Sequence, residues 1–267
     1  MNKTNISRFN GSYCRKMLAN ILASIALSVT GVSAAMADSN PDPLEGINRS
    51  IDSFNHALDG AIIRPVTLMY QDLTPRPIRS CIRNIFGNLS DIWSATNSFL
   101  QARGHDFFNT LGRVLFNTTM GLGGCIDVAS MNGANRINND MGITLGVWGM
   151  GPGPYLVLPI LGPSTVRDGL GSLAGTAIVT SPTTALFKIK PVSTRNPTVA
   201  LYAVNARAGV MDAYDLANEV ALDRYTFIRD AYLQRRKAMV NERINPDELP
   251  DYEDLPDYDD LPDYSDD

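Results

Sequence analysis

Residues 142–175 read GITLGVWGMGPGPYLVLPILGPSTVRDGLGSLAG, and this stretch restricts the fold more than any other part of the chain. It contains nine glycines and four prolines, a composition that an ordinary surface helix does not tolerate. It also carries many large apolar side chains, whereas a solvated linker would be polar. The stretch therefore predicts irregular backbone that packs inside the protein or faces lipid or a partner.

Helical periodicity dominates the chain before this segment. A helix start is indicated by Asp42 as the cap, Pro43 in the first turn and Glu45 three residues after the cap. Gly60 predicts the end of this first helix. One apolar face of the helix is formed by residues at helical spacing: Ile47, Ile51, Phe54 and Leu58.

Further helices are expected on both sides of the segment, because apolar residues recur there at helical spacing. Ser164 is expected to cap a short helix. Long alternation with period two does not occur, so strands are not expected and the fold class is all-α, in a single domain. The expected helices cover residues 62–72, 78–100, 107–116, 199–222 and 225–237, the last ending in Arg235, Arg236 and Lys237, where cations suit the helix dipole.

Both ends of the chain are expected to lie outside the folded domain. Residues 1–37 have the pattern of a signal peptide: basic residues, an apolar stretch and Ala35-Met36-Ala37 before Asp38. A retained anchor helix is the alternative, although about 15 apolar residues fall short of the roughly 20 that cross a membrane. Residues 246–267 repeat a six-residue unit and hold eleven acids with no Lys or Arg, which predicts a disordered tail.

The remaining domain, residues 38–245, is nearly neutral, with 19 basic and 17 acidic residues. Nucleic acid is therefore not an expected partner. Uninterrupted apolar stretches long enough to cross a membrane do not occur, yet the helix faces are strongly apolar. A protein that lies in or on a membrane leaflet fits this combination, and a soluble all-α core is the alternative.

Signals of catalysis are weak. His56 and His105 have no metal-ligand spacing, and neither a G-x-S-x-G motif nor a phosphate-binding P-loop occurs. No cofactor, no metal and no enzymatic activity are expected. Asp42, Glu45 and Asp127 are interpreted as helix caps or solvated acids.

Two cysteines, Cys81 and Cys125, lie within the domain. A disulfide between them and a pair of buried free thiols are both open, because an exported protein occupies a compartment that permits disulfides.

Four segments, in order along residues 40 to 240, resemble the MlaA (VacJ-like) family of outer-membrane lipoproteins. One of them is nearly thirty residues long, which makes the similarity specific. The segments are DPLEGINR at 42–49, NTTMGLGG with IDVA at 117–129, the stretch 142–168, and RDAYLQRR at 229–236.

The resemblance implies a helical, ring-like domain in the inner leaflet of the outer membrane. It further implies an amphipathic channel, a trimeric porin as partner, and transfer of mislocalised outer-leaflet phospholipid to a soluble periplasmic carrier. A porin-associated scaffold without a lipid path is the alternative from a different class of function. A lipid hydrolase with an unrecognised nucleophile is the third.

Within this interpretation, residues Gly142 to Pro163 are expected to form part of the lipid channel or its gate, and a packed core loop is the alternative. Phe54 and Asn55 are candidate gate residues, since the family carries a similar pair. Arg49 and Arg167 are candidates for contact with lipid phosphate, with pairing of Arg167 to Asp168 as the alternative. The channel candidates are Gly142, Leu145, Trp148, Gly153, Tyr155, Leu158 and Pro159.

One feature departs from the family pattern. Family members carry a lipobox cysteine directly after the apolar part of the leader, but here Cys14 precedes that part. We therefore expect an unlipidated protein at the periplasmic face of the outer membrane. Its attachment would depend on apolar helix faces, porin contact or an uncleaved leader.

Overall fold

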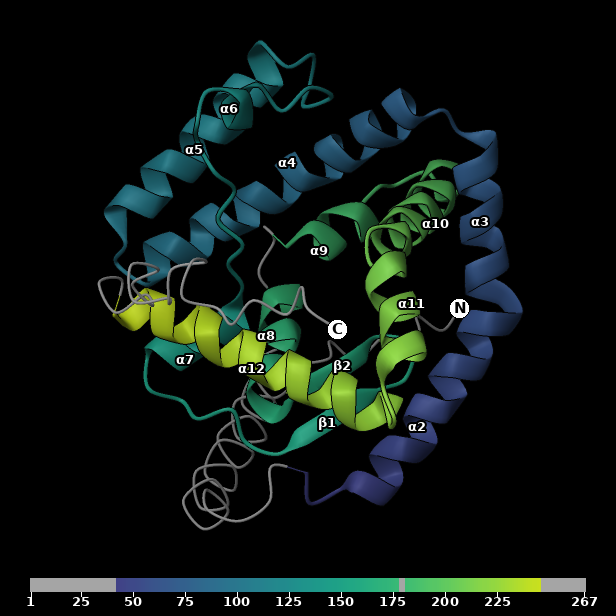
Figure 1. The fold of residues 1–267 in the computed structure, drawn as a ribbon. Helices are drawn as coiled ribbons and strands as arrows, with labels where there is room; N and C mark the ends of the chain where they lie inside the picture. The colour runs from purple at the N-terminus through teal and green to yellow at the C-terminus, as the bar shows by residue number, and fades with distance from the viewer. Residues whose placement is uncertain (1–41, 178–180, 246–267) are drawn as a thin grey trace, which may run out of the picture.

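The computed structural model describes residues 42–177 and 181–245, which are almost entirely helical (Figure 1). The expected helical domain is confirmed, with one two-stranded sheet added. The expected signal peptide and acidic tail lie outside the described residues. The elements are α2 (Glu45–Leu58), the π-helix η1 (Asp59–Ile63), α3 (Arg64–Leu73), α4 (Arg76–Leu100), α5 (Gly104–Thr119), α6 (Val128–Met131), α7 (Met141–Val147), β1 (Tyr155–Leu158), β2 (Gly162–Thr165), α8 (Val166–Ala177), α9 (Pro182–Phe187), α10 (Val192–Ala208), α11 (Met211–Val220) and α12 (Arg224–Ile244).

The helices follow one another around a ring (Figure 1). α2, η1 and α3 form one bent band, α4 leaves its end at an angle, and α5 packs back along α4. α12 crosses the opposite side of the ring beside α7 and the two strands, while α10 and α11 lie inside the band. The ring-like arrangement is therefore present.

Ion pairs connect the outer band to α10, α11 and α12. Each pair joins a residue of α2, η1 or α3 to a residue far along the chain. They are Asp52–Arg224, Asp59–Arg207 with atoms 2.7 Å apart, and Arg64–Asp215 with atoms 2.6 Å apart.

Two expectations about the first helix are wrong. Asp42 does not cap it, because α2 begins at Glu45 and the buried Asp42 carboxylate instead accepts hydrogen bonds from the Asn48 amide and the Tyr225 hydroxyl. Gly60 does not end it either, since the backbone continues through a π-helical turn. A glycine costs a helix only about 1 kcal/mol, which tertiary contacts such as Asp59–Arg207 can offset.

The glycine- and proline-rich segment is more regular than expected. It contains α7, a β-hairpin in which Tyr155 pairs with Thr165 and Leu158 with Gly162, and the start of α8. Strands of four residues are too short to give a clear alternating pattern, which is why the sequence did not predict them.

Glycines let helices approach closely in this segment. A Cβ on Gly146 would lie 2.8 Å from Val240 of α12, and one on Gly171 would lie 2.5 Å from the Gly142 nitrogen. These glycines therefore serve packing of α7 against α8 and α12 rather than irregular backbone.

Three helix ends also differ from expectation. Residues 199–222 are divided at Gly209 into α10 and α11. α12 continues to Ile244, so Arg236 lies inside the helix and not at its end. The hydroxyl of Thr165, rather than Ser164, accepts a hydrogen bond from the Asp168 backbone N–H in the first turn of α8.

A disulfide joins Cys81 of α4 to Cys125 after α5, which decides the question that the sequence left open. The two cysteines are 44 residues apart, so the bond closes a long loop and restricts the unfolded chain.

Replacing both cysteines with serine is expected to lower the free energy of unfolding by about 2–4 kcal/mol. Denaturant unfolding in detergent, followed by circular dichroism, measures this. If reduction of the wild-type protein lowers the free energy of unfolding by the same amount, the loss comes from the disulfide. If neither the substitutions nor reduction lower it, the disulfide does not stabilise the fold.

Candidate lipid-facing surface and polar interior

α4 exposes its large apolar side chains along one stripe. Ile78, Ile85, Ile92 and Phe99 recur at every seventh position and are 41 to 66% exposed. Seven residues are close to two helical turns, so these side chains share one face. The rest of the helix surface buries more polar than apolar side chains. The buried apolar residues are Phe86, Trp93 and Ala95. The buried polar residues are Asn88, Asp91, Ser94, Asn97 and Ser98.

α5 repeats this inverted pattern. Phe108, Leu111 and Leu115 are exposed. All of its buried residues are polar or charged, at spacings of four, three and four: Asp106, Thr110, Arg113 and Asn117. The two helices pack against each other through these polar faces and leave the apolar faces outside.

The same inversion holds over the described part of the chain, where 21 buried polar residues outnumber 13 buried apolar ones and 32 large apolar side chains are exposed. In water, apolar surface costs about 25 cal/mol per Å² to expose. Against hydrocarbon that cost disappears, and polar groups are best placed inside. The distribution therefore fits a lipid environment better than water.

Across the described ranges, none of the helices is both long and apolar enough to cross a membrane. The His, Cys, Asp and Glu residues of the same ranges also form no group of three or more able to hold a metal ion.

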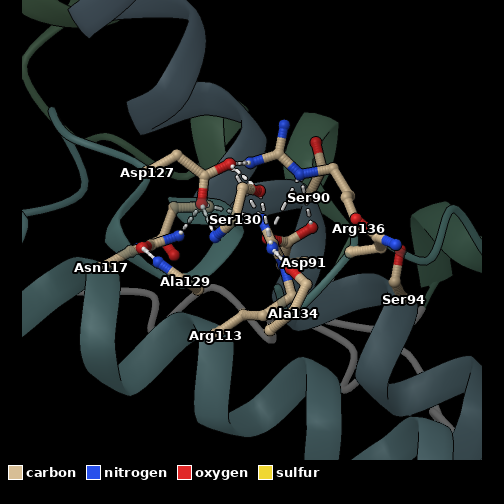
Figure 2. Close-up of polar contacts among 12 residues, drawn as sticks. Ser90, Asp91, Ser94, Arg113, Asn117, Asp127, Ala129, Ser130, Ala134 and Arg136 are labelled. Carbon is tan, nitrogen blue, oxygen red and sulfur yellow. Dashed lines mark hydrogen bonds and ion pairs between the residues drawn. The ribbon is translucent and has the colours of Figure 1, made fainter. Parts of the chain in front are cut away.

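The centre of the polar interior between α4 and α5 is a network of two arginines and two aspartates (Figure 2). Arg113, whose side chain is fully buried, contacts Asp91 at 3.4 Å and Asp127 at 3.0 Å. Arg136 contacts the same carboxylates at 3.1 and 3.6 Å. The four charges sum to zero, so they can be held in a low-dielectric interior.

The two carboxylates of this network are held differently. Burial works to raise the pKa of Asp127, but hydrogen bonds from Ser130, Asn117 and Arg113 outweigh it and keep that pKa well below its usual range. Asp127 also caps α6, as the sequence indicated, by accepting from the Ser130 backbone N–H. For Asp91, burial dominates and raises the pKa. Asp91 is therefore the carboxylate most dependent on its arginine partners.

A second polar group joins α7, α8 and α12. Arg236 contacts Asp140 at 2.6 Å and Asp168 at 2.8 Å. Asp168 also accepts a hydrogen bond of 2.7 Å from the Tyr232 hydroxyl and contacts Arg167 at 3.1 Å. These charges are paired to one another and fix the helices that carry the glycine-rich segment.

Two asparagines of α2 bind the free edge of β1. Asn48 donates to the Tyr155 carbonyl at 3.0 Å and accepts from the Val157 N–H at 2.9 Å. Two helical turns later, Asn55 donates to the Leu158 carbonyl at 3.0 Å and accepts from the Ile160 N–H at 2.7 Å. Asn48 thus satisfies the edge of β1 that β2 leaves open, and Asn55 binds the end of β1 and the turn that follows it.

Replacing Asn48 with alanine is expected to lower the free energy of unfolding by about 2–3 kcal/mol, because it leaves buried backbone groups of β1 and the Asp42 carboxylate with fewer partners. Asn55→Ala, at the more exposed end of the strand, should cost only about 1 kcal/mol. Denaturant unfolding compares the two variants. Equal losses would contradict the account of Asn48 as the principal anchor.

The candidate channel residues lie in different surroundings. Tyr155 is 1% exposed and packs against Tyr225 and Tyr232 in the small apolar core beside β1. Trp148 is exposed at the end of α7, where its indole N–H donates to the Leu100 carbonyl. The others lie within or next to α7 and the hairpin: Gly142 is buried, Leu145, Gly153 and Leu158 are partly buried, and Pro159 is exposed.

The candidate gate and phosphate residues are distributed as follows. Phe54 is exposed on α2, beside the Asn55 that binds β1. Arg49 pairs with Glu45 and with Asp223. Arg167 is buried and pairs with Asp168, the alternative that the sequence left open.

The polar interior itself was missed from the sequence, although a signal was present. Asp106, Thr110, Arg113 and Asn117 have the spacing of one helix face. Polar stripes are normally assigned to solvent, and only the burial of both partners shows that this stripe faces inward.

An apolar exterior around a paired polar interior defines a membrane-associated helical protein. The chain belongs to the MlaA lipoprotein family, whose model matches residues 40–239.

Relatives support this membership. A protein of Escherichia coli strain K12 named "Intermembrane phospholipid transport system lipoprotein MlaA" is 35% identical in an alignment 240 positions long, which covers 86% of this chain and 92% of the relative. A protein of the same name from Haemophilus influenzae is 30% identical in an alignment 239 positions long, which covers 85% of this chain and 91% of the relative. A solved structure described as "Structural basis for maintenance of bacterial outer membrane lipid asymmetry" has 34% identity and a TM-score of 0.63, covering 75% of this chain and 99% of that one.

Proposed function

We propose that this protein transports phospholipid and thereby maintains the lipid asymmetry of the outer membrane. It acts as a passive conduit in the inner leaflet that receives mislocalised outer-leaflet phospholipid and passes it to a soluble periplasmic carrier. The observation that carries this proposal is the inverted surface of α4 and α5, apolar outside and polar inside. The names of the relatives, which describe phospholipid transport, agree with it.

A conduit lowers a large energetic cost. Exposing lipid chains to water costs about 0.8 kcal/mol per methylene, so two long acyl chains would cost on the order of 25 kcal/mol. The exposed apolar side chains keep the protein among acyl chains, where a lipid can enter without crossing water. The headgroup would need polar contacts along the same path.

A trimeric porin is the proposed membrane partner, and the exported chain would sit at the periplasmic face of the outer membrane. Deleting the gene is expected to place phospholipid in the outer leaflet and to raise detergent sensitivity. A deletion strain whose outer leaflet is unaltered would contradict the proposal.

A scaffold that binds porin without a lipid path is the second candidate. A photo-crosslinking residue at Trp148, which is exposed beside the hairpin, separates the two. The conduit predicts phospholipid adducts at this position in outer membranes, whereas a scaffold predicts none.

We also propose that the protein is not an enzyme. Incubation of the purified chain with labelled phospholipid should release no fatty acid. Release that persists in the pure protein would instead favour a hydrolase.

A further inference from the structure

Three arginines on the first two turns of α4 have no acidic partner in the part of the chain that the structure describes. Arg76, Arg79 and Arg83 follow at spacings of three and four, so they lie on one helix face. Among the described residues, no carboxylate lies within ion-pair distance of any of the three. This includes Asp72, which is exposed near the end of α3. Arg83 donates a side-chain hydrogen bond of 3.5 Å to the Ser80 hydroxyl.

This lack of partners contrasts with the arginines that the sequence favoured for phosphate contact. Arg49 is bound by two carboxylates and Arg167 is buried against Asp168. Their positive charge is already neutralised within the protein. Positive charge remains available for an external anion at the start of α4.

The position of the cluster also points to an anion. Cations near a helix N-terminus oppose the helix dipole, so they do not stabilise α4. An anion placed there would interact favourably with the dipole and with the guanidinium groups together.

Two buried polar atoms, one in the cluster and one on α3, lack hydrogen-bond partners among the described residues. They are the Arg79 Nε and the hydroxyl of Tyr70 near the end of α3. Burial raises the pKa of Tyr70, while the positive charges of Arg79 and Arg83 act to lower it. Arg79 differs from the other arginines with an unsatisfied buried nitrogen, Arg136, Arg207, Arg236 and Arg243, because each of those already pairs with a carboxylate. An acceptor from outside the chain would satisfy both buried donors.

The surroundings of the cluster are apolar. Met69 and Leu73 near the end of α3 and Ile78 at the start of α4 are 55, 76 and 51% exposed. Ile78 begins the exposed stripe of α4 that we assign to lipid. The three arginines lie on the other side of α4 from this stripe, because their positions are about 100° or more from Ile78 around the helix. They share with the stripe only the end of the helix, where long cationic side chains reach the level of lipid headgroups.

We propose that Arg76, Arg79 and Arg83, with the Tyr70 hydroxyl, bind the phosphate of an anionic membrane lipid. Met69 and Leu73 of α3, which flank Tyr70 in the sequence, contact its acyl chains. The unpaired positive charge selects a headgroup with net negative charge over a zwitterionic one. This inference rests on the proposed function insofar as it places α4 against lipid.

The full chain in detergent tests the site by titration with dioctanoyl phosphatidylglycerol, dioctanoyl phosphatidylcholine and inorganic phosphate, using native mass spectrometry. Wild-type protein should bind dioctanoyl phosphatidylglycerol more tightly than dioctanoyl phosphatidylcholine. Arg76→Gln with Arg83→Gln should weaken that binding about tenfold or more. Both residues are exposed, so the fold should persist.

Arg235→Gln with Lys237→Gln is the matched control, since it removes two exposed positive charges from α12. It should leave the affinity unchanged. An equal loss in the control would overturn the site, because binding would then follow net charge alone. Inorganic phosphate that competes as well as the lipid would also overturn it, by showing a free-phosphate site.

The Trp148 crosslink separates this inference from the conduit. If phosphatidylglycerol binding is unaffected by the α4 substitutions while Trp148 still captures phospholipid, the arginine site is wrong and the conduit stands. If Trp148 captures no lipid but the α4 variant loses binding, the site stands and the conduit fails.

Discussion

Replacing Ile85 and Ile92 together with lysine should release the protein from membranes. Each residue lies on the exposed stripe of α4. A lysine at the centre of a lipid-facing helix costs about 2.5–3.5 kcal/mol, so the pair should reduce membrane partitioning by a factor of more than about a thousand. Flotation with liposomes measures the bound fraction.

Gln234→Lys with Asn241→Lys is the matched control, because it adds the same charge at exposed polar positions of α12. It should leave partitioning nearly unchanged. Were the folded α4 variant to float with liposomes as the wild type does, the α4 stripe could not be in hydrocarbon.

Replacing Arg113 with methionine should destabilise the fold by about 3–5 kcal/mol, since it leaves the buried Asp91 with one partner fewer. Chemical unfolding in detergent, followed by circular dichroism, measures the change. Adding Asp91→Asn to the same chain removes the unpaired charge and should recover part of the loss. Arg235→Met, at an exposed position, should change stability by less than about 0.5 kcal/mol.

A loss below about 1 kcal/mol for Arg113→Met would show that the network in Figure 2 is incidental to folding, since that is the value of an exposed ion pair. The expected larger loss would show that this network stabilises the packing of α4 against α5.

Much of the helical fold could be predicted from periodicity, because α4 and α5 have long and regular apolar faces. The direction of those faces could not be predicted. An amphipathic helix has the same pattern whether its apolar side faces a core or a lipid. The inverted orientation becomes evident only from the structure, in which Asp91 and Arg113 are buried and paired with each other between α4 and α5.

The asparagine contacts of α2 were equally hidden. Asn48 and Asn55 form hydrogen bonds with backbone more than a hundred residues away, so local sequence holds little trace of them. The π-helical turn at Gly60 was missed for a similar reason. Tertiary contacts of Asp59 outweighed the local preference of glycine for a helix end.

The arginines show the limit of reasoning from residue type. Arg49 and Arg167 were attractive as phosphate ligands because guanidinium matches phosphate geometry. Their availability depends on neighbours such as Asp223 and Asp168, which only the fold brings together.

The most direct test of the account is the environment of a spin label on a cysteine introduced at Ile92, in a Cys14→Ser background, after reconstitution into liposomes. The account predicts that oxygen, which concentrates in hydrocarbon, relaxes this label strongly and that a water-soluble nickel complex does not. A label at Asn241 should show the reverse. If the nickel complex reaches position 92 as readily as position 241, the apolar stripe of α4 faces water and the proposed conduit has no lipid environment.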